Sequence, residues 1–173
     1  TAGIAQAALM PEIIIRNAEP ADFAAITALN QAAVQHTSAM DVQRLQNLHA
    51  LSSYHKVVTV DGVVAGFLLA MRENAPYPND NYGFFAARYV RFLYVDRIVV
   101  DPAFSGLKLG TLLYEDIFRY AHAQAVATIT CEYNIEPPNE ASRRFHDRFG
   151  FTEVGTQWLD GGQKRVSLQA ASC

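Results

Sequence analysis

One segment of the chain decides its interpretation: Asp96-Arg-Ile-Val-Val-Asp-Pro-Ala-Phe-Ser-Gly-Leu-Lys-Leu-Gly-Thr-Leu-Leu-Tyr114. A β-branched run ends before Pro102, a short loop follows, and an apolar helical pattern begins at Leu109. The start of a helix leaves backbone N–H groups without partners and carries partial positive charge. Gly106 and Gly110 allow a ligand to approach the backbone closely. The segment therefore predicts a turn that binds an anion such as a phosphate group.

The spacing of this turn excludes two common phosphate loops. It contains neither Gly-x-x-x-x-Gly-Lys-Ser/Thr nor Gly-x-Gly-x-x-Gly. Without further signals, an ordinary strand-to-helix turn that binds nothing is an equal alternative.

Composition favours a single globular domain without nucleic-acid or membrane partners. The chain has 173 residues, of which half are hydrophobic and 11% aromatic, so it can bury a sizeable core. The net charge is −3 and no Lys/Arg run occurs, which argues against a nucleic-acid partner. No apolar stretch approaches membrane-spanning length. The two cysteines, Cys131 and Cys173, suggest no disulfide framework, so we expect a reducing, cytoplasmic location.

We expect one domain over residues 11–173, preceded by a tail over residues 1–10. The first nine residues make a poor signal peptide because they lack a basic start and an apolar centre. One hypothesis is that the native chain starts at Met10 and that residues 1–9 are vector-derived. The alternative is a native, loosely ordered N-terminus.

The apolar pattern predicts an α/β (α+β) fold. Capping residues and three-residue spacing of apolar positions predict helices that begin near residues 20, 42, 109 and 140, with a capping box at 38–41. Residues 74–83 read as a loop, and 84–91 are ambiguous. We expect strands at 12–16, 56–60, 63–71, 92–100, 126–132, 151–159 and 164–169. Hairpins together with one β-α-β crossover predict a mixed sheet with helices on both faces.

A second motif, Asn139-Glu-Ala-Ser-Arg-Arg-Phe-His-Asp-Arg-Phe-Gly-Phe151, points to one family. It resembles the pattern Asn-x-x-Ala/Ser-x-x-x-Tyr-x-x-x-Gly-Phe of the GCN5-related N-acetyltransferase (GNAT) superfamily, with His146 at the Tyr position. The loop at residues 105–110 resembles that superfamily's Gln/Arg-x-x-Gly-x-Gly/Ala, with Ser105 and Lys108 as departures. The order of elements over residues 12–170 also resembles the GNAT fold, a mixed and mostly antiparallel sheet of about seven strands.

The resemblance implies an acetyl-CoA-dependent N-acetyltransferase. His36, His49, His55 and His122 show no metal-ligand spacing, so we expect no metal. The acceptor would be a primary amine of a small molecule, amino acid or peptide, which attacks directly in a ternary complex. The alternative is a non-catalytic acyl-CoA-binding protein of the same fold. By position in the motifs, the expected cofactor-binding residues are Ile98, Val99, Val100, Gly106, Leu107, Lys108, Leu109, Gly110, Thr111, Asn139 and Arg143.

Three residues are candidates for proton transfer. The resemblance places Glu132, at the end of a predicted strand, as general base, and a partly dry cleft would raise its pKa. Asp96 is the competing base. By alternation it should share a face with Tyr94 and Ile98, and it could instead bind the substrate ammonium or pair with a nearby arginine. His146 is the candidate acid for the leaving sulfur. A structural or exposed role is the alternative for each of the three.

The sequence says less about the acceptor site than about any other part of the expected active site. We expect Tyr82, Tyr94 and Asn134 to contact the amine. The family's acceptor site would also include the loop after the third strand and the last hairpin, which suggests an aromatic and mildly acidic lining that suits a small amine. The residues expected in this lining are Tyr77, Asn79, Asp80, Asn81, Trp158 and Asp160. The sequence is also compatible with a homodimer.

Overall fold

A computed structural model describes residues 9–173, so most of the predicted N-terminal tail lies outside the described residues. The strands are β1 (Ile13–Asn17), β2 (Tyr54–Val60), β3 (Val63–Arg72), β4 (Leu93–Val100), β5 (Thr128–Glu136), β6 (Thr152–Leu159) and β7 (Lys164–Ser172). The α-helices are α1 (Phe23–Ala32), α2 (Val42–Leu51), α3 (Asp80–Ala86), α4 (Leu109–Ala123) and α5 (Glu140–Arg148). No described helix has the length and hydropathy needed to cross a membrane.

The strands form one seven-stranded sheet in the order β1-β2-β3-β4-β5-β7-β6. Every neighbouring pair is antiparallel except β4 and β5, which are parallel. Two parallel neighbours need a crossover, and α4 supplies it. The predicted fold class, a mixed and mostly antiparallel sheet with helices on both faces, is confirmed.

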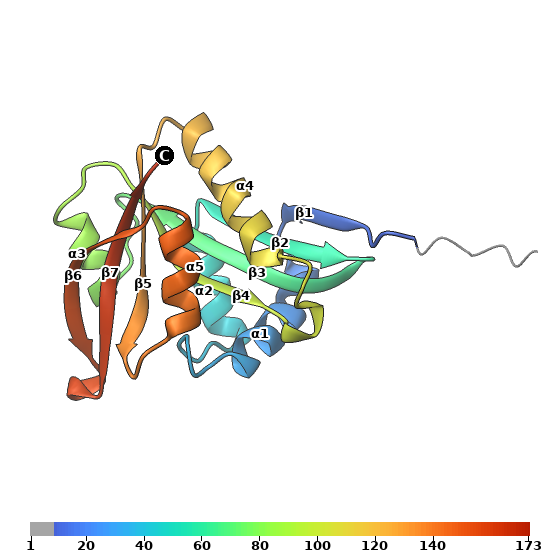
Figure 1. The fold of residues 1–173 in the computed structure, drawn as a ribbon, viewed down its shortest axis with the longest axis horizontal. Helices are drawn as coiled ribbons and strands as arrows, with labels where there is room; N and C mark the ends of the chain where they lie inside the picture. Colours follow the sequence, from blue (N-terminus) through green and yellow to red (C-terminus); the bar gives the residue numbers. More distant parts are fainter. Residues whose placement is uncertain (1–8) are drawn as a thin grey trace, which may run out of the picture.

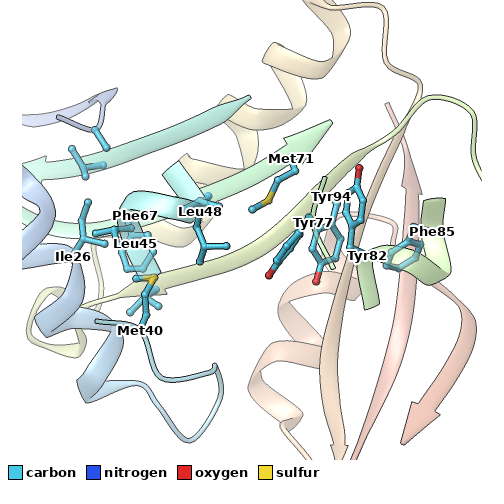
Figure 2. Packing of buried hydrophobic residues seen from close by; sticks show 14 of the residues in the cluster. Ile26, Met40, Leu45, Leu48, Phe67, Met71, Tyr77, Tyr82, Phe85 and Tyr94 are labelled. Carbon is cyan, nitrogen blue, oxygen red and sulfur yellow. The ribbon is translucent and has the colours of Figure 1, made fainter. Parts of the chain in front are cut away.

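Helices cover both faces of the sheet (Figure 1). Alternation along β3 assigns the faces: Phe67, Leu69 and Met71 pack toward α1, α2 and α3, whereas Leu68 and Ala70 pack toward α4. The sheet therefore separates two hydrophobic cores. Figure 2 shows the core on the α1–α3 side, where aliphatic side chains of α1 and α2 lie next to a group of aromatic rings near α3. Partly buried side chains of α5 pack against the other core, on the α4 side.

The sheet splits between β4 and β5. The two strands pair only at Leu93–Ile129 and Tyr94–Thr130, and beyond these pairs they diverge, as Figure 1 shows. β5 instead remains paired with β7 as far as Glu136. Most of the β4 edge, residues 95–100, is therefore left without a neighbouring strand on that side, and this opening positions the site.

A bulge in β4 changes which side chains share a face. Leu69 pairs with Arg97 and Ala70 with Val95, so Asp96 is the extra residue. Tyr94 belongs to the core under α1–α3, whereas Ile98 packs on the α4 side. The prediction that Tyr94, Asp96 and Ile98 share one face is therefore wrong for Ile98, because strict alternation holds only in an unbroken strand.

Three other predictions of local structure are also wrong. Glu132 lies inside β5 rather than at its end, because pairing with β7 extends the strand through polar residues. Helix α3 begins within the predicted loop, where the Asn79 side chain accepts a hydrogen bond from the Tyr82 backbone N–H. Asp41 caps α2 by accepting from the Arg44 backbone N–H, so there is no capping box at residue 38.

The close approach of β3 to β4 predicts that Gly66→Ala is destabilising. An added Cβ would lie 2.8 Å from the Val99 carbonyl oxygen and 3.1 Å from Val58 Cγ1. We expect a loss of about 1–3 kcal/mol in the free energy of unfolding, measured by denaturant titration. Gly83→Ala in α3 is the matched control, since its Cβ would meet nothing within 4 Å, and it should be neutral or slightly stabilising. Equal stability of the two variants would contradict this packing.

Candidate active site

A cleft of about 1180 Å³ lies at the split in the sheet. It brings together residues of the two sequence motifs and of β5. The predicted site residues that line it are Asp96, Ile98, Val99, Val100, Gly106, Lys108, Leu109, Gly110, Thr111, Glu132, Asn134, Asn139 and His146. Four other predicted residues, Leu107, Arg143, Tyr82 and Tyr94, do not line it.

The turn before α4 presents free amides to the cleft. Among the described residues, the backbone N–H groups of Leu109, Gly110 and Thr111 have no hydrogen-bond partner, and no side chain caps the helix. Lys108, at the cap position, has a left-handed backbone (φ 57°), and Gly106 also has positive φ (93°). The turn therefore fits the pyrophosphate of a CoA molecule, with the dipole of a fifteen-residue helix behind it.

The free edge of β4 suits an extended ligand. From Val95 to Val100, β4 pairs with β3 on one side, while the other side faces the cleft instead of β5. The peptide groups on that side are available to hydrogen-bond a ligand as another strand would.

Glu132 combines access to the cleft with a strongly perturbed pKa. The Tyr94 hydroxyl lies 2.9 Å from Oε1 and 2.8 Å from Oε2 of Glu132. Burial, together with the negative charge of Asp96, raises the pKa of Glu132 to about 8, while the hydrogen bonds from Tyr94 and Asn81 and the charge of Arg97 act in the opposite direction. A carboxyl group with this pKa can exchange a proton near neutral pH.

Asp96 is held by two partners and is almost fully enclosed. Its Oδ1 accepts from the Tyr77 hydroxyl at 2.5 Å, and its Oδ2 accepts from Arg97 Nε at 2.7 Å. The Asp96 side chain is 3% exposed and that of Arg97 is 4% exposed. Both hydrogen bonds are short, and the one from Arg97 is also an ion pair.

His146 is buried and both of its ring nitrogens are engaged. Nδ1 lies 2.7 Å from the Ser142 carbonyl oxygen, and since a carbonyl can only accept, Nδ1 carries the hydrogen. Nε2 then accepts from the Tyr114 hydroxyl at 2.6 Å. Burial lowers the pKa of His146, so the imidazole is neutral in this arrangement. Tyr114 also lines the cleft, and sequence reasoning did not identify it because it lies within the apolar stretch of α4.

Other predicted residues have mainly structural partners. Asn139 caps α5 by accepting from the Ser142 N–H, and its Nδ2 lies 3.2 Å from His36 Nδ1. Arg143 pairs at the surface with Glu140. The Tyr82 hydroxyl donates to the Arg72 carbonyl oxygen and accepts from a backbone N–H, which ties the β3–α3 loop together. Trp158, also predicted near the acceptor, is 52% exposed and lies outside the cleft lining.

Two cations that line the cleft, Arg44 and Lys164, were not predicted. Arg44 comes from the first turn of α2 and Lys164 from the start of β7. Neither forms an ion pair with any residue in the range 9–173. The guanidinium of Arg44 lies 5.7 Å from the centre of the Tyr77 ring. Nothing in their sequence neighbourhood distinguishes them from solvent-facing residues. Across the described residues, no group of three or more His, Cys, Asp or Glu side chains is arranged to hold a metal ion.

Comparison with known proteins agrees with this geometry. Residues 21–151, more than half of the chain, match the acetyltransferase (GNAT) family. A stretch of 60 residues is 43% identical to phosphinothricin N-acetyltransferase of Streptomyces coelicolor (strain ATCC BAA-471 / A3(2) / M145). That stretch covers 34% of this chain, and it spans only about a third (33%) of the relative's length.

Solved structures share the fold at low sequence identity. Ard1 from Thermoplasma volcanium superposes with a TM-score of 0.76 at 17% identity, covering 92% of this chain and 97% of that one. The yncA structure from Salmonella typhimurium, which holds its cofactor acetyl-CoA, has a TM-score of 0.69 at 22% identity and covers 93% and 94%. The chain therefore belongs to the GNAT family of acetyltransferases, enzymes that use acetyl-CoA.

Proposed function

We propose that this enzyme transfers the acetyl group of acetyl-CoA to the primary amine of a small amino-acid-like acceptor, by direct attack in a ternary complex. The observation that carries the proposal is the placement of Glu132, a carboxyl group with a raised pKa, at the split between β4 and β5. An amine reaches its reactive form only by losing a proton, and Glu132 is the group that accepts it. Tyr94 holds the carboxylate in place through both oxygens.

The remaining contacts to acetyl-CoA follow from the backbone. The free amides of Leu109, Gly110 and Thr111 hold the pyrophosphate, and the open edge of β4 holds the pantetheine arm. A backbone N–H near Val99 or Val100 then stabilises the negative charge that develops on the thioester oxygen. Acetyl-CoA supplies the activated acyl group, and the chain supplies position, charge and proton transfer.

Tyr114 and His146 form the proton source for the leaving sulfur. The phenol and the imidazole are linked by a 2.6 Å hydrogen bond and both line the cleft. The N–H of His146 is held by the Ser142 carbonyl oxygen, so the transferable proton of the pair is the one on the Tyr114 hydroxyl. We therefore assign proton donation to the pair rather than to the imidazole alone.

The acceptor end favours a substrate with both signs of charge. Arg44 and Lys164 have no ion-pair partner among residues 9–173 and can bind a carboxylate or another anionic group. Asp80 and Asp160 line the same cleft and suit the ammonium form of the incoming amine. The partial match to an enzyme named for phosphinothricin, a small molecule, supports this choice over a peptide acceptor.

The first test concerns acetyl-CoA binding. Lys108→Glu should weaken acetyl-CoA affinity about tenfold, because it places negative charge beside the phosphate-binding amides. Calorimetry at low and high salt measures the effect, which should shrink as salt rises. Lys108→Gln is the matched neutral control and should lose less. Unchanged affinity in both variants would contradict the position of the pyrophosphate.

The second test concerns Glu132. The base works when deprotonated, so kcat/KM should rise with pH through about 8 and then level off. Glu132→Gln should remove this rise and lower the rate on the order of a hundredfold. The assay follows free thiol release from acetyl-CoA with a panel of amino acids that includes phosphinothricin. A near-normal rate in the variant would mean that another group takes the proton.

The stability of the same variant gives a control that needs no acceptor. The folded-state pKa of Glu132 is raised above its ordinary value of 4.5. Its contribution to stability is therefore fully present below about 4.5 and is lost as the pH rises through about 8. The free energy of unfolding of the native protein, relative to Glu132→Gln, should fall across that window in denaturant titrations.

The third test concerns the leaving group. His146→Ala and Tyr114→Phe should each lower kcat while leaving acetyl-CoA affinity little changed. If the two side chains act as a unit, the double variant should be no slower than the worse single variant. Additive losses would show that they act separately, and a normal rate in both single variants would show that the thiolate leaves without an acid from the protein.

A further inference from the structure

We propose that Asp96 is a positioning residue which, together with Arg97, controls the charge state of Glu132 and couples it to the loop between α1 and α2. This inference rests on the proposed function of Glu132 as the base. It also decides between the two carboxylates that the sequence left as alternative bases.

Asp96 lies on the same side of the sheet as Tyr94, as alternation predicts, and there it accepts a hydrogen bond from Tyr77. The bulge at Asp96 brings the next residue, Arg97, to that side as well, where it contacts Asn30 of α1. The Tyr94 hydroxyl donates a hydrogen bond to Glu132, and the Tyr77 hydroxyl donates one to Asp96. The rings of Tyr77 and Tyr94 both pack against Tyr82, with ring centres 5.6 and 5.7 Å apart, and Figure 2 shows the three rings together. The hydroxyl groups that bond the two carboxylates therefore belong to one aromatic group.

Asp96 is poorly placed to take a proton from an amine. One of its oxygens is occupied by the Tyr77 hydroxyl and the other by Arg97, and the side chain is 3% exposed. A base must come within hydrogen-bond reach of the proton that it removes. Asp96 would have to break one of two short bonds to do so, whereas Glu132 borders the cleft and has no arginine bound to its carboxylate.

Arg97 connects this charge pair to the acceptor side of the cleft. Its Nη1 donates to Asn30 Oδ1 and to the Ser38 carbonyl oxygen, each at 3.1 Å. Its Nη2 donates to Ser38 Oγ, also at 3.1 Å. The loop that carries Ser38 forms part of the cleft wall. A shift of this loop would therefore move the cation that balances Asp96, and so change the field at Glu132.

Among the groups around Glu132, Asp96 and Arg97 shift its pKa in opposite directions. The groups that act on Glu132 are Tyr94, Asp96 and Arg97 from β4 and Asn81 from α3. Glu132 in turn affects the thiol of Cys131 and the hydroxyl of Tyr114. Its β7 partner, Leu168, is uncharged. Of these groups, only Asp96 and Arg97 carry opposite full charges, and they act on the pKa of Glu132 in opposite directions.

Carbon-13 NMR of the glutamate carboxyl groups tests the proposal without any acceptor. The protein is labelled at glutamate Cδ and titrated with pH, and the Glu132→Gln variant identifies the Glu132 signal. Asp96→Asn should lower the midpoint of that signal by about one pH unit or more, whereas Arg97→Gln should raise it. Asp96→Glu, which keeps the charge, should restore a midpoint close to that of the native protein.

Asp116→Asn is the matched control. Asp116 on α4 accepts from the Tyr54 hydroxyl at 2.6 Å and from Lys56 Nζ at 2.9 Å, an arrangement like that of Asp96 but outside the cleft. This variant should lose stability and leave the Glu132 midpoint unchanged. Thermal unfolding checks the fold of each variant, and if Asp96→Asn does not fold, the upward shift in Arg97→Gln still decides.

Two results would overturn the inference. One is an unchanged Glu132 midpoint in folded Asp96→Asn, and the other is a downward or absent shift in Arg97→Gln. Failure of the proposed base is a separate outcome. If the midpoints shift as expected but Glu132→Gln still acetylates at the normal rate, Asp96 controls the charge of Glu132 and Glu132 is not the base.

Discussion

The divergence of β4 from β5 is the constraint on which the site depends. A strand that loses its neighbour exposes peptide groups that must find other partners, and here the loss begins directly after Tyr94 and Thr130. β5 keeps its pairing to β7 through Glu136, so the split cannot close without breaking an established ladder. The bulge at Asp96, in the pairing with β3, lies just beyond the last residue of β4 that pairs with β5. The fold therefore holds open a slot whose edge is complementary to an extended, amide-containing ligand.

The same split explains the chemistry of the two carboxylates. Side chains at the opening are shielded from water by the cores on either face, yet they border the cleft. When two carboxyl groups lie near one another and are shielded from water, ionising both costs free energy unless a cation lies beside them. Arg97 binds Asp96 directly, so the proton remains on Glu132 near neutral pH. In the proposed mechanism, the position of this one cation beside Asp96 therefore leaves Glu132 as the carboxyl group that acts as the base.

The sequence predicted most of the fold because most of its signals are local. Apolar spacing identified all seven strands, and Asp61-Gly62, both with positive φ, predicted the β2–β3 turn. Predictions were wrong where tertiary pairing decides. The end of β5 depends on β7, and the bulge in β4 depends on β3. Arg44, Lys164 and Tyr114 could not be assigned to the site, because only the folded chain brings α2, β7 and α4 to one cleft.

His146 shows how a departure from a motif can be misread when only one element is considered. The motif places a histidine where the family pattern has tyrosine, which suggests that a phenol has been lost. In the structure, the hydroxyl of Tyr114, which belongs to α4, lies 2.6 Å from the imidazole. In the proposed mechanism the phenol therefore comes from a neighbouring helix, and the imidazole that accepts its hydrogen bond is held in turn by Ser142. The position of a functional group in the folded cleft therefore matters more than which helix or strand supplies it.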